Sequence, residues 1–427
     1  MVLVALAVPR PAHAFCGFYV GKAGAELYNH ASKVVLVRDG KHTVLTMNND
    51  FEGNFKDFAL VVPVPTVLVK EQIHIGDKRL VDRIDNYSAP RLVEYFDEDP
   101  CEVLKYKMEG EFDMLLGGGG PAVPKPDAAI RHGVKVEAEY TVGEYDIVIL
   151  SAKESDGLET WLEEQGYQIP AKASAALRPY IKQNMKFFVA RVNLKEQKTT
   201  GVTYLRPIQI AYESEKFMLP IRLGMANAKG AQDMLVYTLT KNGRVESANY
   251  KTVNMPSGMD IPLYVKNDFS RFYASTFEQA HKKSDYRAVH TEYVWNANSC
   301  DPCVDEPLTP EELRGLGVYW LDDGRSSAPI ITRLHVRYDA EHFPEDLVFQ
   351  ETGDQSNFQA RYVLRHPFTG KMECTEGETY KKSLPARHAK EAEALAKLTG
   401  WDPHEIAKHM GADAPPPSDP WYKQIWK

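Results

Sequence analysis

The C-x-x-C motif Cys300-Asp301-Pro302-Cys303 is the clearest candidate for chemistry in this chain. Two thiols at this spacing can form a redox couple, supply two zinc ligands, or close a local disulfide. A reactive thiolate needs a nearby cation or a helix N-terminus, whereas Asp301 and Asp305 place negative charge beside this pair. A zinc site needs further Cys or His ligands, and the chain has no second C-x-x-C. We therefore favour a structural disulfide between Cys300 and Cys303, with the redox and metal roles left open as alternatives.

The chain has five cysteines, so one thiol stays unpaired if the other four form disulfides. We prefer a long-range bridge between Cys16 and Cys101, because it would tie the N-terminus of the mature protein to the first β-rich segment. Such a bridge typically contributes about 2–4 kcal/mol by restricting the unfolded chain. Cys374 is then the expected spare thiol.

Two further motifs resemble metal sites but fail on spacing. The histidines of the 404–409 segment are five residues apart instead of four, which turns the second imidazole about 140° away around a helix. We expect both to be exposed helix residues. Residues 48–53 begin like a calcium loop, but the twelfth position holds Ala59 instead of a glutamate. We expect a polar turn there.

The chain contains no G-x-S-x-G nucleophile motif, and its glycine-rich segment at 117–120 lacks the ending of a phosphate-binding loop. We assign no catalytic residue and expect no cofactor. A hydrolase remains an alternative for which no residues can be named.

Residues 1–14 have the pattern of a signal peptide. An apolar run over residues 2–8 is followed by Ala12-His13-Ala14, which fits the small-x-small rule for cleavage before Phe15. The run is far shorter than the roughly 20 apolar residues that span a bilayer, and no later segment reaches that length without charges. We expect an exported, periplasmic or extracellular protein with no transmembrane segment in the mature chain.

The net charge of −8, with Lys and Arg spread along the chain, makes nucleic acid and anionic lipid poor candidate partners. The C-terminus offers a different contact. Trp421, Tyr422 and Trp426 follow a triple proline, and a cluster of aromatic side chains usually covers a surface. That surface is the protein's own body or, in the alternative, another envelope protein.

Most of the elements expected to position these residues are strands. Residues 33–38 and 43–47 flank Asp39-Gly40 as a predicted hairpin, and Asn242-Gly243 predicts a second hairpin turn. Residues 58–65 predict a buried strand halted by prolines. Helices are expected at 77–84, as a pair near 156–184, at 386–398, and after Asp402-Pro403.

These patterns predict an α+β fold, with a predominantly antiparallel β body, an inserted helical pair and a helical C-terminal region. The expected segments are a β-rich body at 15–270, a smaller β-rich region with the C-x-x-C at 271–380, and a helical extension with the aromatic tail at 381–427.

Several stretches carry a resemblance to a known family: 14–17, 58–65, 87–92, the C-x-x-C at 300–303, and 359–367. Taken together, the chain resembles the bacterial family called domain of unknown function 2330. The resemblance implies export and supplies no catalytic residues. We therefore expect a non-enzymatic binding or scaffolding component of the bacterial envelope, stabilised by disulfides. The alternative is a thiol-redox or metal-handling protein centred on the C-x-x-C.

Overall fold

The computed structural model describes residues 12–13, 18–21, 28–52, 58–102, 130–131, 134–153, 155–167, 173–192, 205–226, 230–299, 306–323 and 328–414. The chain divides into two units, each assembled from segments that are distant in sequence. Unit 1 comprises Met1–Ser88, Leu115–Val253 and Tyr286–Phe358, and unit 2 comprises Ala89–Met114, Asn254–Asp285 and Gln359–Lys427.

The fold is α+β with mostly antiparallel sheets, which confirms the predicted class. The segment boundaries expected near residues 270 and 380 fall inside helices α5 (Phe269–Lys283) and α7 (Thr375–Thr399) of unit 2. Sequence order therefore does not mark the units, because unit 2 draws strands and helices from three parts of the chain.

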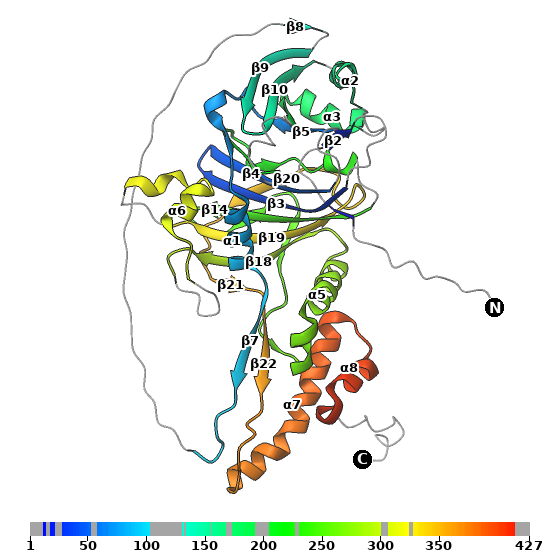
Figure 1. Ribbon diagram of the computed structural model, residues 1–427. Coiled ribbons are helices and arrows are strands. Elements are labelled where there is room, and N and C mark those ends of the chain that lie inside the picture. Colours follow the sequence, from blue (N-terminus) through cyan, green and yellow to red (C-terminus); the bar gives the residue numbers. More distant parts are fainter. Residues whose placement is uncertain are drawn as a thin grey trace, which may run out of the picture. The chain divides into compact units, whose positions relative to one another are not determined.

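The first sheet of unit 1 contains the order β18-β19-β14-β3-β4-β12-β6. Figure 1 labels five of these strands, from β18 to β4. β14 runs parallel to β3 and to β1, and the other neighbours pair antiparallel. The strands are β1 (Ala12–His13), β3 (Tyr28–Asp39), β4 (His42–Glu52), β6 (Ile73–Ile75), β12 (Ile208–Glu213), β14 (Gln232–Thr240), β18 (Ala288–Asn296) and β19 (Ile330–Tyr338). β1 lies within the segment expected to be a signal peptide.

The second sheet of unit 1 is antiparallel throughout, in the order β2-β5-β11-β10-β9-β8. Its strands are β2 (Phe18–Gly21), β5 (Phe58–Val64), β8 (Ile130–Arg131), β9 (Val134–Val142), β10 (Tyr145–Ala152) and β11 (Lys186–Val192). A smaller sheet joins β13 (Met218–Leu219), β20 (Leu347–Glu351) and β15 (Val245–Ser247). β16 (Lys251–Asn254) and β21 (Phe358–Gln359) lie where the chain passes between units.

The two large sheets of unit 1 pack face to face, and helices cover their outer faces. In β3, Val34 and Leu36 enter the core between the sheets, whereas Val35 and Val37 enter a second core beneath helices. That second core is covered by α1 (Lys78–Ser88), α6 (Pro310–Gly315) and η5 (Tyr319–Asp323), and the far face of the other sheet by α2 (Ser155–Glu164) and α3 (Ala173–Lys182). Strands buried on both faces have continuous apolar runs, which explains the unbroken segments seen in the sequence.

The local predictions for unit 1 have mixed outcomes. The hairpin at Asp39-Gly40 is confirmed, because β3 and β4 pair with Asp39 opposite His42 and Gly40 has φ +57°. The hairpin at Asn242-Gly243 is wrong, since β14 pairs with β3 and β19 while β15 pairs with β20. The glycine there serves close packing instead: a Cβ on Gly243 would lie 2.3 Å from the Thr352 carbonyl oxygen.

The polar turn expected at residues 48–53 is also wrong in part, because residues 48–52 continue strand β4. The short helices η2 (Lys70–Gln72) and η3 (Gly224–Ala226) complete the described elements of unit 1.

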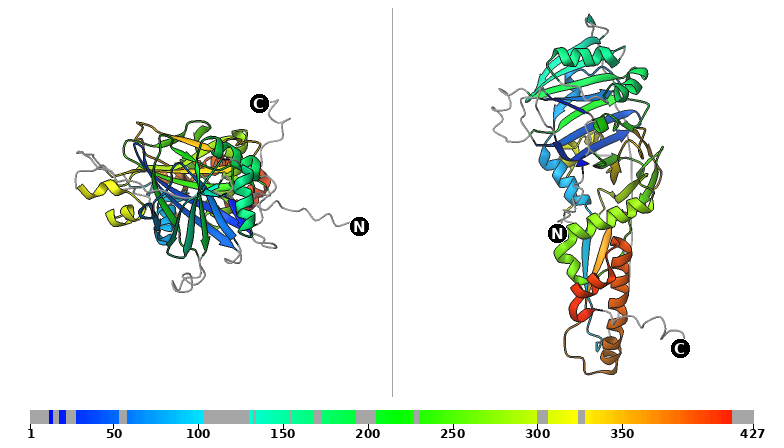
Figure 2. Two further views of the ribbon diagram at one scale, coloured as in Figure 1. Left: turned by 90° about the horizontal axis from the view of Figure 1, so that it is seen from above. Right: turned by 90° about the vertical axis from the view of Figure 1, so that its right-hand side faces the viewer.

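Unit 2 is built on a parallel three-stranded sheet in the order β17-β22-β7, formed by β17 (Met259–Asp260), β22 (Arg361–His366) and β7 (Arg91–Phe96). Figure 2 shows α5, α7 and α8 (Pro403–Met410) packed together beside these strands. The short helices η4 (Leu263–Asp268) and η6 (Gly411–Asp413) precede α5 and follow α8. The core joins Phe272 of α5, Tyr362 of β22 and Leu395 of α7.

The helix expected at 386–398 is longer than predicted. α7 begins at Thr375 and continues through Pro385. Among the described helices, none combines the length and apolar character needed to cross a membrane.

Candidate functional site

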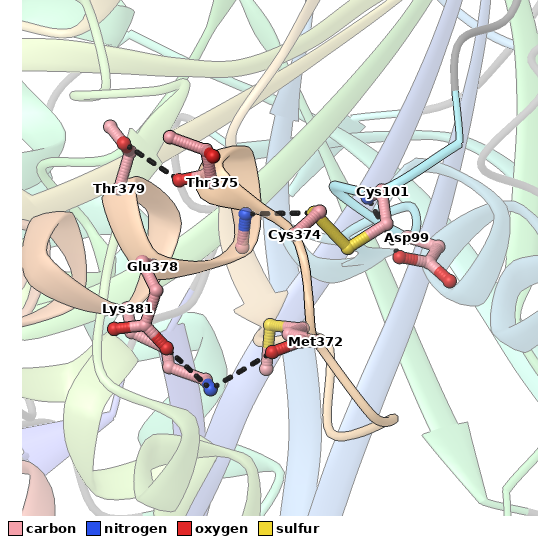
Figure 3. Close-up of a disulfide and its surroundings, with 9 residues drawn as sticks. Asp99, Cys101, Met372, Cys374, Thr375, Glu378, Thr379 and Lys381 are labelled. Carbon is pink, nitrogen blue, oxygen red and sulfur yellow. Dashed lines mark hydrogen bonds and ion pairs between the residues drawn. A yellow bond between two sulfur atoms is a disulfide. The ribbon is translucent and has the colours of Figure 1, made fainter.

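A disulfide in unit 2 joins Cys101 to Cys374 across 273 residues of sequence, with 5.8 Å between the two Cα atoms (Figure 3). It replaces the bridge expected between Cys16 and Cys101, and Cys374 is not the spare thiol. The expected pairing rested on position along the chain. The observed one follows from the fold, because β7 and β22 pair side by side and carry the two cysteines that follow them to the same end of the sheet.

Cys374 is also the N-cap of α7. Its Sγ accepts a hydrogen bond from the backbone N–H of Gly377 at 3.1 Å, while the Cys101 N–H donates to the Asp99 carboxylate at 2.8 Å (Figure 3). A helix N-terminus favours negative charge on a capping atom, whereas Glu376 and Glu378 in the first turn oppose it. The disulfide and this hydrogen bond brace the start of α7, and both cysteines are half-buried.

The other residues singled out from the sequence lie outside the described residues: Cys16, Cys300, Cys303, Trp421, Tyr422 and Trp426. Among the residues that are described, no group of three or more His, Cys, Asp or Glu side chains is arranged to hold a metal ion. His404 and His409 are exposed on α8, as expected from their spacing.

A cavity of about 80 Å³ lies in unit 2 between the short helix η4, strand β22 and helices α7, α8 and η6. Its wall combines acidic, basic and aromatic side chains, and the ring of His409 stacks on Tyr264 with 5.3 Å between ring centroids. The lining residues are Pro262, Leu263, Tyr264, Arg365, His388, Glu391, His409, Met410 and Asp413.

Glu391 is the buried carboxyl of this cavity. It is 4% exposed, and its Oε1 has no hydrogen-bond partner within the described part of the chain. The nearest cation, Arg387, lies 3.6 Å away through Nε and is itself paired with Asp97 at 2.5 Å. Burial, opposed by Arg387 and reinforced by the negative charge of Asp260 and Asp413, raises the pKa of Glu391 to about 7.

The raised pKa of Glu391 predicts that unit 2 loses stability as the pH rises. A carboxyl favoured in its protonated form by the fold stabilises the folded state fully below its ordinary pKa, and that contribution disappears as the pH rises through about 7. Glu391→Gln should therefore match the wild type near pH ~5 and be more stable by about 2 kcal/mol near pH ~8. Hydrogen exchange of α7 peptides measures the difference. Glu393→Gln, an exposed change on the same helix, is the matched control, and an equal response in both variants would contradict the prediction.

Unit 1 contains a chain of charged side chains on one face of its first sheet, with Glu292 and Arg333 buried and the others half-buried. Arg333 donates through Nε to Glu292 at 2.5 Å and through Nη1 to Asp85 at 2.6 Å. His335 Nδ1 lies 2.8 Å from the other oxygen of Glu292, and its Nε2 lies 3.3 Å from Asp233. Arg337 also pairs with Asp233, and Lys33 also pairs with Asp85, so these two basic residues lie at the ends of the charge chain.

The geometry of β18 makes this charge chain possible. The pairing of β18 with β19 shifts register between Thr291 and Tyr293, so Glu292 occupies a β-bulge, a feature that redirects a side chain. Burial alone would lower the pKa of His335, but the charge of Glu292 and the hydrogen bonds that the ring N–H groups donate to Asp233 and Glu292 outweigh it and raise the pKa. Burial alone would raise the pKa of Asp233, but His335 and Arg337 hold it well below its usual value.

Neither the cavity nor this charge chain was predicted from the sequence. Arg333, His335 and Arg337 alternate along β19, which is a sequence signal for one charged face of a strand. Their acidic partners come from β14, β18 and α1, and nothing in the sequence pairs them.

A more apolar hollow of about 340 Å³ lies on unit 1. Its wall includes three prolines and two methionines, with Lys216 donating to the side-chain oxygen of Gln183 at 2.6 Å. The lining residues are Leu45, Pro63, Pro65, Gln183, Met185, Tyr212, Ser214, Lys216, Met218 and Pro220.

The sequence model of a family described as "Uncharacterized protein conserved in bacteria (DUF2330)" matches residues 10–350. The chain belongs to the DUF2330 family. This membership confirms the resemblance inferred from the sequence. No curated protein and no solved structure gives a significant match.

The DUF2330 match covers the described elements of unit 1 as far as β20 and only part of unit 2. Cys101 lies inside the matched residues, whereas Cys374 and the α7 and α8 helices lie beyond residue 350. The family match therefore reaches Cys101 and the η4 side of the cavity, but not Cys374 or the lining residues from β22, α7, α8 and η6.

Proposed function

We propose that this DUF2330 protein works outside the cytoplasm as a non-enzymatic binding or scaffolding component of the bacterial envelope. The observation that carries the proposal is the Cys101–Cys374 disulfide. Disulfides form and persist in oxidising compartments and are rare where glutathione and thioredoxin keep thiols reduced. The apolar run and Ala12-His13-Ala14 at the N-terminus support the same location.

Binding is favoured over catalysis by the character of the cavities. In unit 2, a buried carboxyl oxygen faces a small cavity without a hydrogen-bond partner in the described structure. In unit 1, the larger hollow is lined mainly by apolar side chains, as in many ligand pockets. The aromatic tail, with Trp421, Tyr422 and Trp426, supplies a further contact to an envelope partner.

Counting thiols tests the proposal. With Cys101 bonded to Cys374 and the C-x-x-C closed as a local disulfide, we expect one free thiol, Cys16, among the five cysteines of the exported protein. Alkylation of denatured, unreduced protein followed by mass spectrometry measures this number, and N-terminal sequencing should begin at Phe15. Protein that stays in the cytoplasm with all its thiols free would contradict export and disulfide bracing together.

A thiol-redox function is the second candidate, and the position of Cys374 favours it. The hydrogen bond from Gly377 N–H to Sγ at the start of a 25-residue helix would stabilise a thiolate after reduction. Measurable reductase activity that disappears in Cys374→Ser would support this candidate.

The redox or metal role centred on Cys300 and Cys303 is tested separately. Metal analysis of the exported protein with and without Cys303→Ser decides it. Unchanged metal content together with reduced stability would leave only the structural disulfide.

A further inference from the structure

The cavity of unit 2 presents two buried polar atoms that lack hydrogen-bond partners in the described structure. Oε1 of Glu391 is one, and the hydroxyl of Tyr264 is the other; both residues line the cavity. Buried polar groups are almost always hydrogen-bonded, because burial removes their hydrogen bonds to water and leaving these unreplaced costs free energy. Two such atoms on the wall of one cavity therefore indicate a place where a ligand or ordered water supplies the missing bonds.

The charges around this cavity favour a ligand that donates hydrogen bonds. Arg365 lines the cavity and pairs with Asp260 at 3.3 Å, and Arg387 pairs through Nη1 with Asp97 at 2.5 Å, so each guanidinium group has its closest carboxylate partner outside the cavity lining. Arg387 reaches Glu391 only through Nε, at 3.6 Å. Asp413 at the exposed rim has only a long approach of 3.9 Å to His388 Nδ1 among the ion pairs described. The carboxylate oxygens of buried Glu391 and of Asp413 at the rim are therefore left to accept hydrogen bonds from a ligand.

The size of the cavity limits the ligand to a small group. Its volume of about 80 Å³ compares with roughly 30 Å³ for one water in the liquid. An ammonium group with one or two attached carbons fits this space, and a larger molecule can extend outward past the rim.

We propose that this cavity binds the ammonium end of a small organic amine, with the Glu391 carboxylate as its buried counter-charge and Asp413 completing the site at the rim. The inference deepens the binding function proposed above and rests on it. The hydroxyl of Tyr264 accepts a further N–H from the same group, so the ligand supplies bonds to both unpartnered atoms.

Binding should be linked to proton release from Glu391. In the folded protein, burial and nearby charges raise the pKa of this carboxyl to about 7, and a bound cation favours its ionised form. The affinity should therefore rise about tenfold per pH unit below that value and level off above it, or roughly 30-fold between pH ~5.5 and pH ~8.

Other groups that face Glu391 could add to this pH dependence. They are Tyr264 from η4, Arg365 from β22, Asp260 from β17, Arg387 and His388 from α7, His409 from α8 and Asp413 from η6. A variant with His388→Gln and His409→Gln separates the histidines from Glu391, because it should keep most of the pH dependence.

Isothermal titration calorimetry of the full chain with ethylammonium chloride tests the proposal, with sodium acetate as an anion of similar size. We expect the ammonium ion to bind and acetate not to bind. Glu391→Gln should weaken ammonium binding at least tenfold at pH ~8 and abolish its pH dependence. Asp413→Asn, at an exposed position, should weaken binding severalfold without affecting folding, and Glu393→Gln on the same helix should change nothing.

Three results would overturn the proposal. Acetate binding in preference to ethylammonium would make this an anion site served by Arg365. Absence of binding in the wild type would leave a water-filled cavity. A pH dependence that follows the histidines would remove Glu391 as the counter-charge. If any of these occurs while the protein is exported with one free thiol, the amine site alone fails and the envelope function stands.

Discussion

Replacing Glu292 by glutamine is expected to lower the free energy of unfolding of unit 1 by about 3–5 kcal/mol. Glu292 is fully buried, and its two oxygens contact Arg333 at 2.5 Å and His335 at 2.8 Å. Removing one charge from a buried ion pair leaves its partner without compensation in a medium that solvates charge poorly. Hydrogen exchange of peptides from β18 and β19 measures the loss within unit 1.

The effect of Glu292→Gln should also depend on pH in a defined direction. The raised pKa of His335 stabilises the folded state fully below its ordinary value of about 6.5, and this contribution is lost as the pH rises through the folded-state pKa. Without Glu292 that pKa falls, so the difference between wild type and variant should be largest near pH ~6 and narrow toward pH ~9. The lowered pKa of Asp233 acts only at acidic pH, below the range of this experiment.

Glu215→Gln is the matched control for this change. Glu215 pairs with Lys41 at the surface, where the two side chains are 77% and 61% exposed. Exposed pairs of this kind contribute less than about 1 kcal/mol. A loss for Glu292→Gln as small as that of the control would show that the charge chain does not stabilise unit 1.

Removing the Cys101–Cys374 disulfide is expected to lower the stability of unit 2 by about 2–5 kcal/mol. The bridge closes a loop of 273 residues, and a crosslink over a long loop strongly restricts the unfolded chain. The double variant Cys101→Ser with Cys374→Ser is preferred, because a serine hydroxyl can still accept the hydrogen bond from Gly377 N–H at the start of α7. Hydrogen exchange of α7 peptides reports the change.

Reduction of the wild type is the control for the disulfide variant. In the α7 peptides of unit 2, a reductant should bring the wild type to the protection level of the double variant and leave the variant unchanged. Changing Cys374 to alanine instead of serine should add about 0.5–2 kcal/mol, which isolates the capping contribution. Equal stability of oxidised wild type and double variant would contradict a bracing role.

Much of the local structure could be predicted from sequence because it depends on neighbouring residues. Asp39-Gly40 specifies a tight turn through the positive φ of its glycine, and the strands on either side pair as expected. Asp402 and Pro403 begin α8, with the Asp402 carboxylate accepting from His404 N–H at 2.6 Å. Asn242-Gly243 shows the limit of this approach, because the same kind of signal marks a close backbone contact there instead of a hairpin.

The candidate site was only partly foreseeable. Glu391 lies four residues before Leu395 on a predicted helix, so the sequence places it on the apolar face. The sequence does not reveal that Asp260 and Asp413 approach the same carboxyl, or that Arg387 turns toward Asp97. Those contacts join parts of the chain that are far apart.

The sequence by itself determined the α+β class, the family and the strands whose apolar runs are buried on both faces, because those features follow from short-range pattern and composition. Only the tertiary structure decided that Cys374 bonds to Cys101, that a bulge directs Glu292 between Arg333 and His335, and that Glu391 lines a cavity. The physical reason is distance along the chain. Such contacts depend on which strands pair and how helices dock. The residues next to a position in the sequence do not specify which distant residues it contacts in the folded protein.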